Sequence, residues 1–287
     1  MRTFKNTLIA AALSSTALLA FAQQAQPPIR IAHIDTFSGP TASTGTTVSK
    51  TLLYAVSLIN ERGGVLGRKL EVIQLDNAGD SNKAISMLTS TIDQKINFMV
   101  QAGNSGIAGA LLTAVDKHNQ RNPDSRLLYL NYGSALPELT EAKCSFWMFR
   151  FEAHQRMKMN AIADYVAKTP AIQKIYLLNQ DYSFGQEVSK DAKAIIGKAR
   201  PDVKFVGDDL HPFGKIKDFS PYILKIKQSG ADTVLTGNWG NDLALLVRAS
   251  KEAGLKTKYI SYYGGLFSMP TAIGAAGDKG HLARQQA

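Results

Sequence analysis

The first regular pattern of apolar and polar positions in the chain is a short apolar stretch, followed by a polar loop and then by a helical spacing of apolar residues. Apolar and β-branched residues at 29–36 predict a strand, and residues 37–45 are rich in Ser, Thr, Gly and Pro. Beyond them, Val48, Leu52 and Val56 recur at the spacing of one helix face. A strand that leads through such a loop into a helix begins a doubly wound α/β unit, whose ligands bind at the carboxyl ends of the strands. The loop offers hydroxyl and N–H groups with little charge, which suits a small polar ligand better than a metal.

The same alternation continues through the first half of the chain. Strands are expected at 69–76, 97–102 and 126–131, and helices at 81–93 and 107–118. Four strands that alternate with helices predict one α/β lobe built on a parallel sheet.

The pattern is interrupted at 139–151, an aromatic stretch without helical period that we interpret as an extended crossover. A second alternating series follows, with helices at 152–168, 184–199, 219–228 and 242–253 and strands at 174–179, 203–208, 232–238 and 258–263. We therefore predict two Rossmann-like, doubly wound lobes with a ligand cleft between them. The first lobe is expected at 27–145, a hinge crossover at 146–151 and the second lobe at 152–280.

The first 22 residues have the composition of an export signal. Arg2 and Lys5 precede an apolar run at 8–21, and Ala20-Phe21-Ala22 is a small-x-small cleavage site. The alternative is a membrane anchor, but the run is short for a span. We predict a cleaved signal peptide at 1–22 and a periplasmic protein without a membrane anchor.

Charge and cysteine content narrow the function classes. The chain of 287 residues has a formal net charge of +10 and one cysteine, Cys144, which excludes an internal disulfide. Its basic residues are scattered, with no Lys/Arg run interleaved with aromatics, and this favours a solvated surface over a nucleic-acid site.

No motif for catalysis, metal binding or phosphate binding is present. The five histidines show neither H-x-x-x-H nor H-E-x-x-H spacing, and both G-x-x-x-x-G-K-[ST] and G-x-G-x-x-G are absent. Asp35, Asp76 and Asp80 fall at expected strand ends, where they are either catalytic carboxylates or, as we favour, helix caps, turn residues or charges on the lobe surface. We expect no enzyme activity and no cofactor.

Four sequence pieces, in this order and spacing, resemble the periplasmic solute-binding proteins of the branched-chain amino acid ABC importer family. They are Ser-Gly-Pro at 38–40, Asn-Glu-Arg-Gly-Gly-Val-Leu-Gly-Arg at 60–68, Pro-Glu-Leu-Thr at 137–140 and Asn-Gln-Asp-Tyr-Ser-Phe-Gly at 179–185. The resemblance implies a type I periplasmic binding protein with two hinged lobes, a ligand closed between them, an inner-membrane ABC permease as partner and no catalysis. We expect a monomer.

The resemblance also implies which residues line the cleft. Ser105 falls where the first lobe supplies a hydroxyl to the ligand, or alternatively serves only as a helix cap. Ser134 and Ala135 fall on the neighbouring loop, whose backbone and hydroxyl are expected to face a ligand carboxylate. Phe184 and Trp239 are expected on the second-lobe wall, although core packing is an equal alternative for Trp239 and Tyr182. Thr44 stands where the family often has a larger aromatic residue, which implies a roomier pocket.

Two departures from the family are visible. Tyr263 replaces an acidic residue that meets the ligand's α-ammonium, so a carboxylate with an aromatic or aliphatic body and no ammonium is expected to fit better than an amino acid. Asp181 or Asp242 would restore the amino acid interpretation if either reached inward. The family also continues beyond Gly277 with segments that return to the first lobe, whereas residues 281–287 look unrelated.

These observations predict the binding component of an importer that captures a small carboxylate ligand. The alternative is a ligand sensor that docks on a signalling receptor, because one fold serves both uses.

Overall fold

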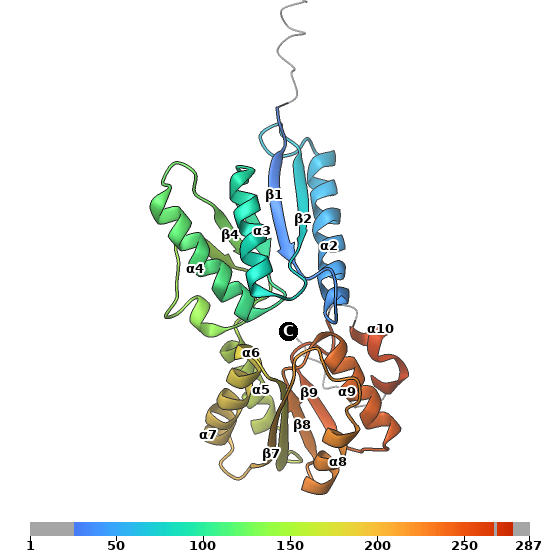
Figure 1. Ribbon diagram of the computed structural model, residues 1–287. Coiled ribbons are helices and arrows are strands. Elements are labelled where there is room, and N and C mark those ends of the chain that lie inside the picture. The colour runs from blue at the N-terminus through green and yellow to red at the C-terminus, as the bar shows by residue number, and fades with distance from the viewer. Residues whose placement is uncertain (1–25, 267–268, 278–287) are drawn as a thin grey trace, which may run out of the picture.

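The computed structural model describes residues 26–266 and 269–277, which form two α/β lobes stacked end to end (Figure 1). Each lobe contains one sheet in which all strands are parallel. The predicted signal peptide at 1–22 and the tail at 281–287 lie outside the described residues. The expected α/β class with two doubly wound lobes is confirmed.

The first lobe has a sheet of five strands in the order β2-β1-β3-β4-β5. Its elements are β1 (Ile29–Asp35), α2 (Ala42–Glu61), β2 (Leu70–Asp76), α3 (Ser81–Asp93), β3 (Phe98–Gln101), α4 (Ser105–Arg121), β4 (Leu128–Asn131), the 3-10 turn η2 (Pro137–Leu139) and β5 (Met148–Arg150).

The second lobe has a sheet of four strands in the order β7-β6-β8-β9. Its elements are α5 (Gln155–Ala167), β6 (Lys174–Gln180), α6 (Ser183–Asp191), the π-turn η3 (Ala192–Ile196), α7 (Gly197–Ala199), β7 (Lys204–His211), α8 (Ser220–Ser229), β8 (Thr233–Thr236), α9 (Gly240–Glu252), β9 (Lys258–Ser261), α10 (Met269–Ile273) and the 3-10 turn η4 (Gly274–Gly277).

Most predicted elements are confirmed, although several begin or end a few residues from the predicted positions. α4 begins two residues earlier than predicted, because Asn104 caps it by accepting the N–H groups of Gly106 and Ile107. The helix predicted at 184–199 is interrupted by a π-turn. The crossover predicted at 146–151 includes β5, whose backbone pairs with β4. The chain therefore passes between lobes at 151–154, after the last strand of the first sheet and before α5.

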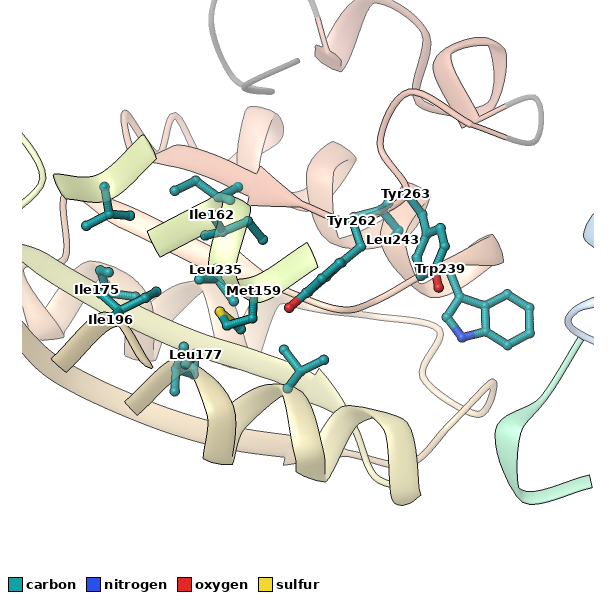
Figure 2. Close-up of a cluster of buried hydrophobic side chains, with 14 of the residues drawn as sticks. Met159, Ile162, Ile175, Leu177, Ile196, Leu235, Trp239, Leu243, Tyr262 and Tyr263 are labelled. Atoms are coloured by element: carbon teal, nitrogen blue, oxygen red, sulfur yellow. The ribbon is translucent and has the colours of Figure 1, made fainter. Parts of the chain in front are cut away.

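Side chains on both faces of β6 are buried, as expected for a parallel strand covered by helices on either side. Ile175 and Leu177 belong to one apolar cluster, and Tyr176 and Leu178 belong to another. In Figure 2, Ile175 and Ile196 lie at one end of the first cluster, and Trp239 and Tyr263 lie at its other end. The core of this lobe thus continues into the surface that faces the first lobe.

Among the described helices, none combines the length and the apolar character needed to cross a bilayer.

Close packing at the start of α6 generates a stability prediction. A Cβ on Gly185 would lie 1.9 Å from the carbonyl oxygen of Gln180, so Gly185→Ala is expected to lower the free energy of unfolding by about 1–3 kcal/mol. Gly197 is a matched control, since a Cβ there meets nothing nearer than 4.0 Å, and Gly197→Ala should raise stability by roughly 0.5–1 kcal/mol. Urea unfolding monitored by circular dichroism measures both changes. Equal midpoints for the two variants would contradict the prediction.

Candidate functional site

The strand order reverses once in each sheet, and the two reversals face each other across the gap between the lobes. In the first sheet β2 and β3 lie on opposite sides of β1, and in the second sheet β7 and β8 lie on opposite sides of β6. Loops diverge at such a point and leave a crevice beyond the carboxyl ends of the strands. The arrow of β1 in Figure 1 points toward the second lobe, so this crevice opens between the lobes.

A cavity occupies this position and is lined by residues of both lobes. Its empty space, including the mouth that opens to solvent, is about 510 Å³. All seven residues predicted for the site are among those that line it: Thr44, Ser105, Ser134, Ala135, Phe184, Trp239 and Tyr263. The fold therefore brings together side chains that the sequence places up to 219 positions apart.

The first-lobe wall presents the N-terminus of α4. Ser105 is the first residue of this helix and is buried, and neither its hydroxyl nor its N–H makes a hydrogen bond to any described residue. The cap is provided by Asn104 rather than by Ser105. Free donors at a helix N-terminus, together with the helix dipole, favour an anion such as a carboxylate.

Ser134 contributes in a different way from that expected. Its hydroxyl donates to the carbonyl of Ala102 at 2.9 Å, and its N–H donates to Asn131 Oδ1 at 2.8 Å. The hydroxyl hydrogen therefore holds the β3 and β4 loops together instead of pointing to a ligand. The N–H of the next residue, Ala135, makes no hydrogen bond within the described part of the chain, which leaves it as the second donor of this wall.

The second-lobe wall is aromatic. Trp239 Nε1 donates to the hydroxyl of Tyr182 at 2.8 Å. The ring centroid of Phe184 lies 6.0 Å from the ring centroid of Tyr182 and also 6.0 Å from that of Tyr263. Burial raises the pKa of the Tyr182 and Tyr263 hydroxyls, so both are neutral near pH 7. This wall offers flat apolar surface and neutral hydroxyls.

The Tyr263 ring is supported from outside the cavity. The Lys158 ammonium lies 4.8 Å from the ring centroid and forms an ion pair with Glu152. A cation over a ring face is attracted by the electrons of the ring. Lys158 is itself buried, and its contact orients the tyrosine without placing a positive charge on the cavity lining.

Asp35, at the carboxyl end of β1, also lines the cavity, although it is not among the residues predicted for the ligand site. It is fully buried and accepts hydrogen bonds from the N–H groups of Thr36 at 2.8 Å, Ala102 at 3.2 Å and Gly103 at 3.3 Å, and from the Tyr132 hydroxyl. The sequence signal for this role is its position at the end of β1, where the strand order reverses, although the same position also fits a cap or a turn residue.

Burial would by itself raise the pKa of the Asp35 carboxyl. The contacts with His33, the Tyr132 hydroxyl and the Thr36 N–H outweigh this effect and hold the pKa below its ordinary value of 3.8. Asp35 is therefore ionised at neutral pH.

The two carboxylates considered as alternative partners for a ligand ammonium do not line the cavity. Asp181 is exposed and accepts from Gln186 Nε2 at 2.9 Å. Asp242 is buried, and its Oδ2 accepts from Gln180 Nε2 at 2.8 Å and from the Gly214 N–H at 2.9 Å. In the described structure, the carboxylate at the cavity comes from the first lobe.

Across the described residues, no three His, Cys, Asp or Glu side chains are grouped as a metal site requires.

Two α/β lobes with parallel sheets, and a cavity between the points where the two strand orders reverse, define a two-lobed binding protein. Residues 28–283 match the family described as periplasmic binding protein, and the chain belongs to this family. Its fold is that of type I periplasmic binding proteins.

The chain is 36% identical over 274 residues to Leu/Ile/Val-binding protein homolog 4 of Brucella abortus (strain 2308), with 94% of this chain and 65% of the relative covered. It is also similar to a leucine-, isoleucine-, valine-, threonine- and alanine-binding protein from Brucella ovis, whose crystal structure shows the closed conformation. That similarity has 36% identity, a TM-score of 0.72 and coverage of 87% of this chain and 64% of the other. The chain thus spans slightly less than two thirds of the length of these relatives.

A more distant structure shares the fold. It is an ABC transporter solute-binding protein from R. palustris in complex with benzoate, with 19% identity, a TM-score of 0.75 and coverage of 88% and 66% of the two chains.

The environment of Asp35 predicts how stability depends on pH. Because the folded-state pKa lies below 3.8, the ionised carboxylate stabilises the folded chain above that pH, and this contribution is lost as the pH falls through 3.8 toward the folded-state value. Asp35→Asn removes the titrating group, so its unfolding midpoint should fall less steeply on acidification than that of the wild type. Tyr132→Phe keeps the carboxylate but removes one donor and should give an intermediate slope. Thermal unfolding between pH 7 and pH 2 tests this order, and parallel curves for all three chains would contradict it.

Proposed function

We propose that this chain is the substrate-binding component of an ABC importer, which captures a small carboxylate ligand between its lobes and delivers it to an inner-membrane permease. It works in the periplasm as a monomer after removal of the signal peptide at 1–22. Membership of the periplasmic binding protein family and the similarity to Leu/Ile/Val-binding relatives support this assignment. Binding proteins of this family release their ligand unchanged, so we propose no chemical step.

One observation carries the proposal: free donors and an aromatic surface face each other across a single cavity. On one side are the N–H and hydroxyl of Ser105 and the N–H of Ala135, and on the other are Phe184, Trp239 and Tyr263. The donors suit the carboxylate of a ligand, and the rings suit an apolar body. Because the two walls belong to different lobes, a ligand that contacts both stabilises the closed arrangement.

The ligand class proposed here is an amino acid or an aromatic or aliphatic carboxylic acid. The relative from Brucella ovis, at 36% identity, is described as binding leucine, isoleucine, valine, threonine and alanine, which favours testing aliphatic amino acids first. Benzoate belongs in the same screen because a solute-binding protein of this fold binds it.

The Ser105 donor is expected to dominate affinity. A hydrogen bond to a charged group contributes about 1.5–3 kcal/mol, so Ser105→Ala should weaken binding of the best ligand roughly 10- to 100-fold. Ser57→Ala is the control, since Ser57 lies on the exposed face of α2 and bonds only to the carbonyl of Tyr54. A thermal-shift screen selects the ligand and calorimetry measures both variants. Unchanged affinity in Ser105→Ala would place the carboxylate elsewhere.

Closure of the lobes generates a second prediction. The lobes meet at the cleft mouth, where a Cβ on Gly214 would lie 3.2 Å from Pro40 Cβ and one on Gly240 would lie 3.7 Å from Thr44 Oγ1. Binding is expected to populate this closed arrangement by rotation about the crossover after β5. Small-angle scattering should show a smaller radius of gyration with ligand than without. An unchanged radius at a ligand concentration that calorimetry shows to be saturating would contradict hinge closure.

A further inference from the structure

Lysines gather at the end of the second lobe that lies away from the cavity. The cavity residues Tyr182, Trp239 and Tyr263 follow the carboxyl ends of β6, β8 and β9, so these strands begin at the opposite end, the lower end of the molecule in Figure 1. Helices that connect parallel strands run back along the sheet, so they end where the strands begin. We call this end the basic pole and define it by eight exposed residues: Lys168, Lys174, Lys198, Lys204, Lys227, Lys251, Lys256 and Lys258.

Three lysines of the basic pole form a row across the starts of the strands. Lys174 begins β6, Lys204 begins β7 and Lys258 begins β9. In the sheet Lys174 is the direct partner of Lys204, and Lys258 is the partner of Thr233 in β8. Neighbouring strands lie about 4.8 Å apart, and like charges placed side by side at this spacing repel each other. The row therefore favours an external counter-charge.

Carboxylates of the second lobe do not neutralise the basic pole. Within the described residues, none of its eight lysines takes part in an ion pair. Asp202 is paired with Arg200 at 2.7 Å, and Asp232 Oδ2 accepts the backbone N–H groups of residues 173 and 174. Asp164 and Glu252 are the other described carboxylates at these helix ends, and both are exposed. The lysines outnumber these acids, so the face is positively charged.

Helix dipoles explain only part of this arrangement. A lysine near a helix C-terminus is favourable, and this accounts for Lys227 in the last turn of α8 and Lys251 in the last turn of α9. It does not account for lysines at strand starts, because a sheet has only a small net dipole. The fold does not require basic helix ends either, since α2 and α3 have no basic residue in their last turns.

Cations at the strand starts of the first lobe have partners within the protein. Arg30 in β1 and Lys69 just before β2 each donate to a backbone carbonyl of a neighbouring segment. The ammonium groups of Lys174, Lys204 and Lys258 make no hydrogen bond to a described residue. Their charges are thus available to a partner outside the chain.

We propose that the basic pole docks on the anionic phospholipid surface of a membrane. Attraction between lysines and anionic headgroups adds up over a broad face and needs no shaped pocket. A protein interface needs an apolar centre, whereas among the exposed large apolar side chains of the described residues only Tyr165 lies near a helix end of this pole. The same scarcity of aromatic side chains disfavours single-stranded nucleic acid, whose bases stack on such rings.

Docking in this way keeps the cavity free. The basic pole and the cavity lie at opposite ends of the second lobe, so a chain held at the bilayer still exposes its cleft to solutes. The inference goes beyond the proposed function and does not depend on the identity of the ligand.

Vesicle sedimentation tests the inference on the chain purified from the periplasm of expressing cells. Mass spectrometry verifies that residues 1–22 are absent, so that the apolar run at 8–21 does not itself insert into lipid. The wild type should bind vesicles of mixed phosphatidylglycerol and phosphatidylcholine at least about 10-fold more tightly than vesicles of phosphatidylcholine alone. This binding should be lost between about 0.01 M and about 1 M salt, because the Debye length falls from about 30 Å to about 3 Å. Equal binding to the two lipids, or no binding to either, overturns the inference.

Two variants with the same change in charge identify the face responsible. The pole variant replaces the strand-start lysines: Lys174→Gln, Lys204→Gln and Lys258→Gln. The control variant replaces exposed lysines on α2, α3 and α4 of the first lobe: Lys50→Gln, Lys83→Gln and Lys117→Gln. The pole variant should bind the mixed vesicles about 10- to 100-fold more weakly than the wild type, and the control variant within about 2-fold of it. Equal weakening in both variants overturns the assignment to the basic pole.

Circular dichroism establishes that both variants are folded. If the pole variant does not fold, a variant at the helix ends takes its place, with the same weakening expected: Lys168→Gln, Lys227→Gln and Lys251→Gln. The lipid and salt comparisons on the wild type decide the inference independently of any variant.

Further probes separate the membrane from other anions. A short DNA duplex that binds more tightly than the mixed vesicles, and less tightly to the pole variant, would assign the face to nucleic acid and overturn the inference. Inorganic phosphate should displace the chain from vesicles no better than chloride at equal ionic strength, and stronger displacement would indicate a discrete anion site instead. Calorimetry with the best cavity ligand should give equal affinities for the wild type and the pole variant, so failure of lipid docking leaves the proposed function untouched.

Discussion

The Asp35 carboxylate is the interaction on which the first-lobe half of the site depends. From the end of β1 it accepts N–H groups of the loop after β3 and the hydroxyl of Tyr132 in the loop after β4. Three loops are thereby joined at one buried anion, and the loop that leads to Ser105 is held by its backbone. Removing this acceptor would take away the hydrogen-bond partner of the Ala102 and Gly103 N–H groups, and buried N–H groups are costly to leave unpaired.

The contrast between the two cavity walls follows from the geometry of parallel α/β lobes. All strands of a parallel sheet end at the same edge, and each following helix begins there, so backbone donors and helix dipoles gather at that edge. In the first lobe α4 presents those donors to the cavity through Ser105. In the second lobe the corresponding positions after β6, β8 and β9 carry Tyr182, Trp239 and Tyr263, and the aromatic core continues up to the cavity. One lobe therefore offers polar groups and the other offers apolar surface.

The differences between predicted and observed elements have local causes. The helix predicted at 81–93 is confirmed because its apolar period and the Asp80 cap agree. The predicted start of α4 is two residues late because its first two residues, Ser105 and Gly106, carry no apolar signal, and the capping role of Asn104 depends on its side-chain geometry. β5 has only three residues, too few for a period to be recognised, and it is defined by pairing with the edge of β4.

The sequence by itself determined the α/β alternation, the two lobes and the strand-end loops, because burial periodicity and glycine-rich turns are local properties of the chain. Together with the family resemblance, it also indicated the residues that line the cavity. The tertiary structure decided how those residues work. Asp35 meets Ala102 across 67 positions and Tyr132 across 97, and the Ser134 hydroxyl is committed to Ala102 across 32. Such contacts depend on strand order and loop packing, which bring distant residues within hydrogen-bond distance and which no local pattern specifies.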